Sequence, residues 1–287
     1  MIIYTDLHNR TKNYSLSEQV RTQIERDYDV TITTDMHPLA EIYWGDKITD
    51  MHIMEMSRLK WIHLSKTGFG KFNLPDHIKV TNTPDSSNGV AEYAVTGVLY
   101  LLRGLHNMPL DRSAFDSRID NILPFNEVKC LIVGHGRIGK LINRKLTGLS
   151  MKVEYITRST TLSDIDYSKY NFIINTLPLN SDTGNYFDKN IFGRMNKNSY
   201  IVNVGRGETI NERDLYSALQ KGDIRGAFLD VVQDEPIQST NSLLKLDNVF
   251  ISPHIANALH NALDTQVKAF INNLERYKSN EILENRV

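Results

Sequence analysis

Short runs of apolar, β-branched and aromatic residues alternate with helix-like stretches along nearly all of the 287-residue chain. Between the early runs, residues 15–27 and 50–58 have helical patterns. The runs predict strands at residues 1–6, 30–34, 41–44, 61–65, 79–82, 128–133, 152–157, 172–176, 200–204, 224–231 and 249–251. Such alternation is typical of parallel sheets with crossover helices. Because the later strands have the spacing of a six-stranded doubly wound sheet, we expect an α/β chain with two doubly wound parallel-sheet domains.

Two helical segments predict where one domain ends and the other begins. Asn88 is positioned to cap a helix over residues 89–104, which is apolar almost throughout and must be buried on more than one side. It could bridge two domains or fill a subunit interface. A second apolar stripe follows residue 257 at helical spacing, at Leu259, Leu263, Val267, Phe270, Ile271 and Leu274. If this C-terminal helix packs on the first unit, one domain holds residues 1–98 plus 263–287, and the other holds residues 99–262.

Composition narrows the class of function. With 33 Lys and Arg against 34 Asp and Glu, the net charge is −1, which gives no electrostatic argument for binding nucleic acid or an acidic membrane. The single cysteine, Cys130, excludes an internal disulfide and favours a reducing compartment. No secretory pattern, long apolar run or metal-binding histidine spacing is present in this sequence. We expect a cytoplasmic protein without a metal that acts on a small molecule.

A glycine-rich turn follows the sixth predicted strand. Gly134 permits a tight turn, Gly136 lets a pyrophosphate approach the backbone, and Gly139 lets the following helix pack closely on the strand. A pyrophosphate there meets free N–H groups at the positive end of the helix. The expected cofactor contacts in this segment are Gly134, Gly136, Arg137, Ile138 and Gly139. An ordinary glycine-rich turn is the alternative, but the strand before it and the helix after it favour dinucleotide binding.

The end of the next strand predicts which dinucleotide binds. NAD-preferring sites place Asp or Glu there to bind the ribose hydroxyls. This sequence instead has Thr157, Arg158, Ser159 and Thr160. Arg158 can pair with a 2′-phosphate, and the hydroxyls can donate to it. We therefore favour NADP(H), while a solvated Arg158 would leave NAD open.

Three further polar segments follow predicted strands, at the edge where open α/β sheets bind ligands. They contain Arg206, Glu235 and His254, each of which has an ordinary structural alternative when taken singly. Their order after a nucleotide-binding turn is more specific than any one of them.

Together these motifs resemble the D-isomer-specific 2-hydroxyacid dehydrogenases. The resemblance rests on G-H-G-R-I-G, N-V-G-R-G-E, F-L-D-V-V-Q-D-E-P and S-P-H-I-A, and covers residues 68–256. It implies a flavodoxin-like substrate domain, a Rossmann cofactor domain and a catalytic set of Arg206, Glu235 and His254. It further implies a substrate loop formed by Lys66, Thr67, Gly68 and Phe69, with Arg206 also binding substrate. Additional cofactor contacts implied are Leu177, Pro178, Thr183, Val204, Gly205 and Asp230.

The chemistry of these side chains suits reduction of a 2-oxoacid. His254 can deliver a proton near neutral pH, and a carboxylate beside it, Glu235, would favour the imidazolium. Arg206 can bind the substrate carboxylate and polarise the carbonyl. We expect an oxidoreductase that transfers hydride between NADP(H) and a 2-oxoacid/D-2-hydroxyacid pair, with glyoxylate, hydroxypyruvate or a larger 2-oxoacid as substrate.

Two alternatives remain open. One is an NAD-preferring D-2-hydroxyacid dehydrogenase, and the other is a dinucleotide-sensing binding protein of the corepressor type. The apolar helix at residues 89–104 further favours a homodimer.

Overall fold

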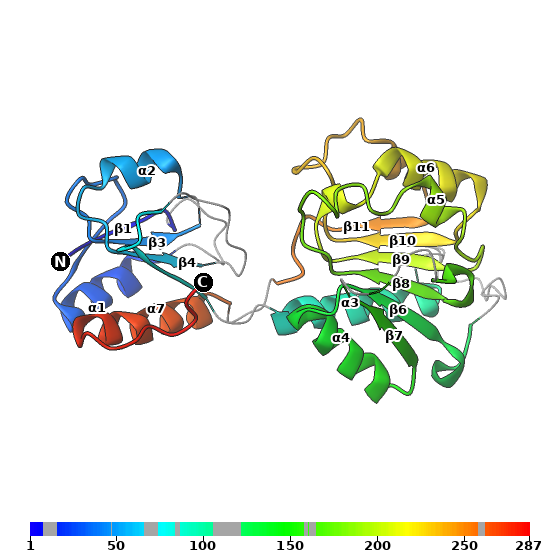
Figure 1. Cartoon of the computed structure of the whole chain (residues 1–287), viewed down its shortest axis with the longest axis horizontal. Coiled ribbons are helices and arrows are strands. Elements are labelled where there is room, and N and C mark those ends of the chain that lie inside the picture. Colours follow the sequence, from blue (N-terminus) through cyan, green and yellow to red (C-terminus); the bar gives the residue numbers. More distant parts are fainter. Residues whose placement is uncertain are drawn as a thin grey trace, which may run out of the picture. The chain divides into compact units, whose positions relative to one another are not determined.

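The computed structural model describes residues 1–7, 16–46, 48–65, 74–83, 87–105, 122–157, 160, 165–257 and 262–287. The chain divides into two compact units, one of residues 1–86 and 258–287 and the other of residues 87–257. We had expected the boundary between residues 98 and 99. The division instead assigns the whole helix that contains these residues, Ser87–Leu102, to the second unit. Each unit is a parallel sheet flanked by helices (Figure 1), so the predicted fold class is confirmed.

The sheet of the first unit has five parallel strands in the order β2-β1-β3-β4-β5, which is the flavodoxin-like order. The strands are β1 (Ile2–Thr5), β2 (Thr31–Thr33), β3 (Ile42–Gly45), β4 (Trp61–Leu64) and β5 (Lys79–Asn82). The helices are α1 (Glu18–Tyr28), α2 (Asp50–Glu55) and α7 (Ala262–Lys278). Figure 1 shows α1 and α7 on one face of this sheet and α2 on the other.

Helix α7 completes the core of the first unit, although it lies near the other end of the chain. The Phe270 ring is fully buried and stacks on Trp44 with ring centroids 3.9 Å apart. It also stacks on Trp61 at 5.4 Å. Burial of one such aromatic side chain contributes about 2–3 kcal/mol. Val267, Phe270, Ile271 and Leu274 of the apolar stripe read from the sequence thus belong to the core of the first unit.

The second unit has a six-stranded parallel sheet in the order β7-β6-β8-β9-β10-β11. Its strands are β6 (Lys129–Val133), β7 (Lys152–Ile156), β8 (Phe172–Asn175), β9 (Tyr200–Asn203), β10 (Gly226–Leu229) and β11 (Val249–Ile251). Its helices are α3 (Ser87–Leu102), α4 (Arg137–Gly148), α5 (Lys189–Phe192) and α6 (Glu212–Lys221), with short 3-10 turns at Phe125–Glu127, Tyr167–Lys169, Gly207–Thr209 and Ser242–Lys245. The strand order changes direction between β6 and β8, which is where doubly wound sheets bind ligands.

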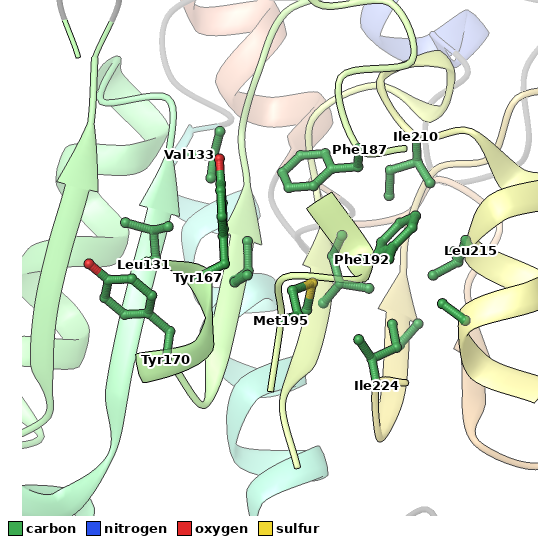
Figure 2. Close-up of a cluster of buried hydrophobic side chains, with 14 of the residues drawn as sticks. Leu131, Val133, Tyr167, Tyr170, Phe187, Phe192, Met195, Ile210, Leu215 and Ile224 are labelled. Carbon is green, nitrogen blue, oxygen red and sulfur yellow. The ribbon is translucent and has the colours of Figure 1, made fainter. Parts of the chain in front are cut away.

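The sheet of the second unit separates two apolar clusters. One lies with α5 and α6 and includes Leu131, Ile173, Phe187 and Leu215 (Figure 2). The other lies with α3 and α4 on the opposite side. Cys130 belongs to this second cluster, and burial raises the pKa of its thiol to about 12. Both faces of this sheet are therefore covered by apolar side chains.

Helix α3 corrects one expectation. It begins at Ser87, so Asn88 lies within its first turn and donates to Glu92 Oε1 at 2.8 Å, where we had expected a cap. The helix packs on its own sheet, with the Tyr93 and Phe228 ring centroids 5.3 Å apart.

Among the described residues, no helix is both long and apolar enough to cross a membrane.

A buried polar chain runs through the core of the first unit. Trp61 Nε1 donates to Thr81 Oγ1 at 2.9 Å, and Thr81 Oγ1 lies 2.8 Å from His63 Nδ1. All three groups are satisfied when the Thr81 hydroxyl donates to Nδ1 and the imidazole is neutral. Burial accordingly lowers the pKa of His63 to about 3.

We predict that His63 makes the first unit sensitive to acid. The pKa of histidine in an unfolded chain is about 6.5, so only the unfolded state takes up a proton between this pH and about 3. The stabilisation is fully present above pH 6.5 and is lost as the pH falls. The free energy of unfolding should therefore fall by about 1.4 kcal/mol per pH unit from this group.

The measurement is urea unfolding followed by tryptophan fluorescence, because both tryptophans, Trp44 and Trp61, lie in the first unit. Between about pH 6 and pH 5, His63→Gln should lose roughly 1 kcal/mol less than the unmodified chain. His77→Gln, which alters an exposed histidine, should retain the full loss. Equal losses in the unmodified chain and in His63→Gln would contradict the prediction.

Candidate active site

Three polar loops emerge at the same edge of the second sheet. Strands β9, β10 and β11 are parallel neighbours, with Leu229 paired with Asn203 on one side and with Ile251 on the other. Their carboxyl ends therefore meet at one edge. The loop after β9 carries Arg206, and the loop after β10 carries Glu235. The loop after β11 carries His254, so all three residues lie within loops of the same edge.

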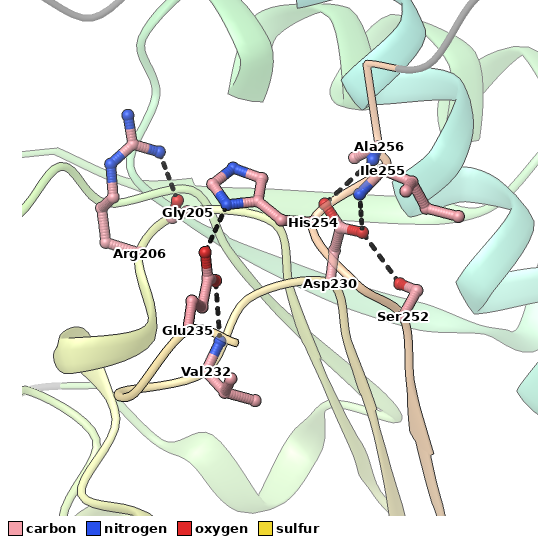
Figure 3. Close-up of polar contacts among 9 residues, drawn as sticks. All are labelled: Gly205, Arg206, Asp230, Val232, Glu235, Ser252, His254, Ile255 and Ala256. Atoms are coloured by element: carbon pink, nitrogen blue, oxygen red, sulfur yellow. Dashed lines mark hydrogen bonds and ion pairs between the residues drawn. The ribbon is translucent and has the colours of Figure 1, made fainter. Parts of the chain in front are cut away.

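His254 and Glu235 are in direct contact. His254 Nδ1 lies 2.7 Å from Glu235 Oε2, while the Val232 N–H donates to Glu235 Oε1 at 3.3 Å (Figure 3). An ionised carboxylate can only accept, so Nδ1 carries the hydrogen. The other ring nitrogen, Nε2, is then the atom that can exchange a proton with a ligand. Both side chains are partly exposed, which keeps the pair within reach of a small molecule.

Asp230 shapes the turn that carries His254. Its Oδ1 accepts from Ser252 Oγ and from the Ile255 N–H, both at 2.8 Å, and its Oδ2 accepts from the Ala256 N–H at 3.0 Å. The His254 backbone has a φ of 53°, in the left-handed region that non-glycine residues rarely adopt. Figure 3 shows the Asp230 carboxylate turned toward this backbone. These contacts fix a strained turn and thereby the direction of the imidazole.

Buried amides hold the Arg206 turn. Asn203 Oδ1 accepts from the Gly205 N–H at 3.0 Å, and Asn203 Nδ2 donates to Arg206 O at 3.2 Å. Asn175 Nδ2 donates to Asn203 Oδ1 at 2.9 Å from the neighbouring strand. The Arg206 side chain is exposed and donates to Gly205 O at 2.7 Å. The turn is rigid, while the guanidinium lies at the surface.

The Arg206 and Glu235 loops pack through Gly207. A Cβ at this position would lie 1.9 Å from Val232 O, a distance at which the backbone itself must move. Any larger residue would separate the two loops. Glycine is therefore needed for a close approach of Arg206 to the segment that carries Glu235.

The glycine turn after β6 fits a pyrophosphate. Gly134 has a φ of 98°, and a Cβ on Gly139 would lie 2.2 Å from Gly134 O. Gly136 is the N-cap of α4 and forms no side-chain cap, and a Cβ there would meet nothing within 4 Å. The backbone at Gly136 is thus open to an approaching group at the positive end of a helix. The first turn of α4 has no acidic residue that would repel an anion.

Other expected contact residues lie at the same edge of the sheet. Thr157 follows β7, and its N–H donates to Thr160 Oγ1 at 3.0 Å. Leu177 and Pro178 follow β8, and Thr183 Oγ1 donates to Pro178 O at 2.6 Å. Val204 follows β9 and is buried. The expected residues Lys66, Thr67, Gly68, Phe69, Arg158 and Ser159 lie outside the described residues.

Sequence reasoning missed the supports beneath this edge, namely Asn175, Asn203, Thr209 and Ser252. A signal was present, because an asparagine ends two neighbouring buried strands. Asn175 and Asn203 face each other in the register of β8 and β9.

Within the part of the chain that the structure describes, no group of three or more His, Cys, Asp or Glu residues could hold a metal ion.

The chain is similar to a known protein family and to several of its members. Residues 98–256 match the family model described as D-isomer specific 2-hydroxyacid dehydrogenase, NAD binding domain. A probable 2-ketogluconate reductase of Dictyostelium discoideum is 34% identical over 184 residues, which cover 60% of this chain and 53% of that protein. A glyoxylate reductase of Korarchaeum cryptofilum is 33% identical over 173 residues, 54% of this chain and 51% of that protein. The chain thus spans about half the length of these two relatives.

Solved structures show the same fold over the whole chain. A D-isomer specific 2-hydroxyacid dehydrogenase family protein from Klebsiella pneumoniae aligns with a TM-score of 0.84 at 23% identity, covering 100% of this chain and 97% of that one. An NADPH-dependent glyoxylate/hydroxypyruvate reductase from Sinorhizobium meliloti, in complex with NADP and sulfate, aligns with a TM-score of 0.81 at 21% identity, covering 100% and 98%.

The close approach at Gly207 gives a stability prediction. Gly207→Ala should lower the free energy of unfolding by on the order of 3 kcal/mol, because its methyl group would overlap the Val232 carbonyl. Gly148→Ala is the matched control, since a Cβ at the end of α4 would meet nothing within 4 Å and alanine favours helix. Thermal unfolding followed by circular dichroism compares the two. A Gly207→Ala variant as stable as Gly148→Ala would show that the two loops do not pack as described.

Proposed function

Since the chain belongs to the D-isomer specific 2-hydroxyacid dehydrogenase family, we propose that it interconverts a 2-oxoacid and the corresponding D-2-hydroxyacid with NADP(H) as cofactor. The observation that carries this proposal is the 2.7 Å contact between His254 Nδ1 and Glu235 Oε2. It leaves an imidazole nitrogen available for proton transfer at the sheet edge that also holds Arg206 and the glycine turn.

His254 is the proposed acid of the reduction. Its Nε2 donates a proton to the carbonyl oxygen of the substrate, and Glu235 stabilises the imidazolium that this step requires. Asp230 and Ser252 keep the ring directed by fixing its turn. In the oxidation direction the neutral imidazole accepts the hydroxyl proton.

Arg206 is the proposed electrostatic partner of the substrate. A guanidinium can pair with the 2-oxoacid carboxylate and stabilise negative charge on the carbonyl oxygen. Buried Asn203 holds the backbone of Arg206, and the guanidinium lies exposed beside Gly205 O. The segment Lys66–Phe69 is proposed to bind the substrate.

The dinucleotide would be held by the glycine turn, by the residues after β7 and β8, and by Val204 and Gly205. Its nicotinamide supplies the hydride when bound. The open backbone at Gly136 fits the pyrophosphate. Thr157 replaces the acid that NAD-preferring sites use, and Arg158 would pair with a 2′-phosphate, which supports NADP(H) over NAD(H).

The substrate is proposed to be a small 2-oxoacid such as glyoxylate or hydroxypyruvate. Relatives are named for glyoxylate and hydroxypyruvate, among them the Sinorhizobium meliloti reductase. We further propose a homodimer, supported by the partly exposed apolar side chains of α3. We propose a cytoplasmic location, supported by the single cysteine, Cys130, which favours a reducing compartment.

The experiment that tests the function is a screen of 2-oxoacids for loss of the absorbance of NADPH and NADH, in parallel. The proposal expects turnover with at least one small 2-oxoacid and faster turnover with NADPH. Dinucleotide binding without turnover of any 2-oxoacid would instead favour a binding protein.

Removing the proposed acid gives a kinetic prediction. His254→Ala should lower turnover by about 10²–10⁴, the usual contribution of general acid–base catalysis. The dissociation constant of NADPH, measured by fluorescence, should change little, because the imidazole acts on the substrate. An unchanged rate would remove His254 from the mechanism.

Gly136→Ala should separate cofactor binding from stability. A methyl group at Gly136 meets nothing within 4 Å in the free protein. The unfolding temperature of Gly136→Ala should therefore be close to that of Gly148→Ala. The same methyl group would occupy the approach of the pyrophosphate, and NADPH should bind at least tenfold more weakly by calorimetry. Unchanged NADPH affinity would place the pyrophosphate elsewhere.

A further inference from the structure

The middle residue of the glycine turn, His135, is stacked on β7. Its imidazole lies parallel to the Tyr155 ring, with centroids 3.5 Å apart and an interplanar angle of 6°. His135 Nε2 is covered by protein and has no hydrogen-bond partner. A covered nitrogen without a partner costs free energy, so this ring is held in a place where its own hydrogen-bonding capacity is unused.

The stack lies close in the chain to the position that distinguishes the two dinucleotides. β7 pairs with β6 so that Tyr155 lies opposite Ile132. Tyr155 and Thr157 point to the same side of their strand because side chains alternate. Thr157 stands where NAD-preferring sites have the acid that binds the ribose 2′-hydroxyl. His135 is therefore anchored on the side of the turn where a ribose 2′-substituent would lie.

The charges around His135 are positive. Lys140 and Arg137 lie in the first two turns of α4, whose amino end is itself positive, and Tyr155 is the titratable group that β7 presents to the ring. Burial, and then the charge of Lys140, lower the pKa of His135. The imidazole of the free protein is thus neutral, and the positive charges around it favour binding of an anion.

We propose that His135 is a specificity-determining residue that takes up a proton from solvent and donates it in a hydrogen bond to the 2′-phosphate of NADP(H). The proposal rests on the proposed function, since it concerns the same dinucleotide. A phosphate dianion offsets the repulsion between the imidazolium and Lys140. Because Nε2 is covered by protein, the hydrogen bond to the phosphate is donated by the other ring nitrogen, Nδ1. The 2′-hydroxyl of NAD(H) carries no charge, so it leaves the ring neutral.

The test measures binding alone and needs no turnover. Dissociation constants of NADP⁺ and NAD⁺ are measured by calorimetry at about pH 8 and pH 6 for the unmodified chain and for His135→Phe. Phenylalanine keeps the stack on Tyr155 but cannot be protonated. Free NADP⁺ titrates identically in both experiments, so comparing the two proteins isolates what the imidazole adds to binding, including its effect on the bound phosphate.

The proposal expects that lowering the pH strengthens NADP⁺ binding at least about threefold more in the unmodified chain than in His135→Phe, because the complex takes up a proton that the free protein does not. NAD⁺ should show no such difference. In nuclear magnetic resonance spectra, the His135 signal, assigned by its loss in His135→Gln, should titrate at higher pH with NADP⁺ than with NAD⁺.

The outcomes distinguish this proposal from the proposed function. Binding of both dinucleotides with equal pH dependence in the two proteins would overturn the role of His135 and leave the function intact. Equal weakening of NADP⁺ and NAD⁺ by His135→Phe would assign the ring a packing role only, which also overturns it. If neither dinucleotide bound, both proposals would be overturned together.

Discussion

The parallel pairing of β9, β10 and β11 is the constraint on which the site depends. Because these strands run side by side in one direction, the loops that follow them must emerge at one edge. Arg206, Glu235 and His254 are far apart in the chain, and this pairing brings their loops to one edge. The same sheet presents its glycine turn at the point where the strand order reverses, so one edge has both a place for a dinucleotide and the groups proposed to exchange protons.

Buried polar groups convert that placement into a fixed geometry. A buried carboxylate is costly unless its oxygens are paired. Asp230, of which only 2% is exposed, meets this requirement with Ser252 and two backbone N–H groups. Those contacts hold His254 in a left-handed backbone conformation. Asn203 has the equivalent role for Arg206. The buried polar contacts of this unit thus orient the turns that carry His254 and Arg206, two side chains that contribute little to its core.

The strands and the glycine turn could be predicted from the sequence, because apolar runs and glycine spacing are properties of a few consecutive residues. Other features depend on contacts that no local pattern contains. The stack of His135 on Tyr155 follows from the register of β6 and β7, and the facing of Asn175 and Asn203 follows from the order of the sheet. The boundary of the second unit lies before α3 because Tyr93 packs on Phe228, more than a hundred residues later. The capping preference of Asn88 was misleading, because the helix already includes Ser87 and Asn88 lies within its first turn.

The contact between His254 and Glu235 is tested most directly by a double-mutant cycle on the rate of 2-oxoacid reduction. If the carboxylate acts through the imidazole, Glu235→Gln lowers kcat/KM in the unmodified chain and has almost no further effect in His254→Ala. If instead the two substitutions multiply in their effects, the residues act independently, and the account of the site given by their 2.7 Å contact is wrong.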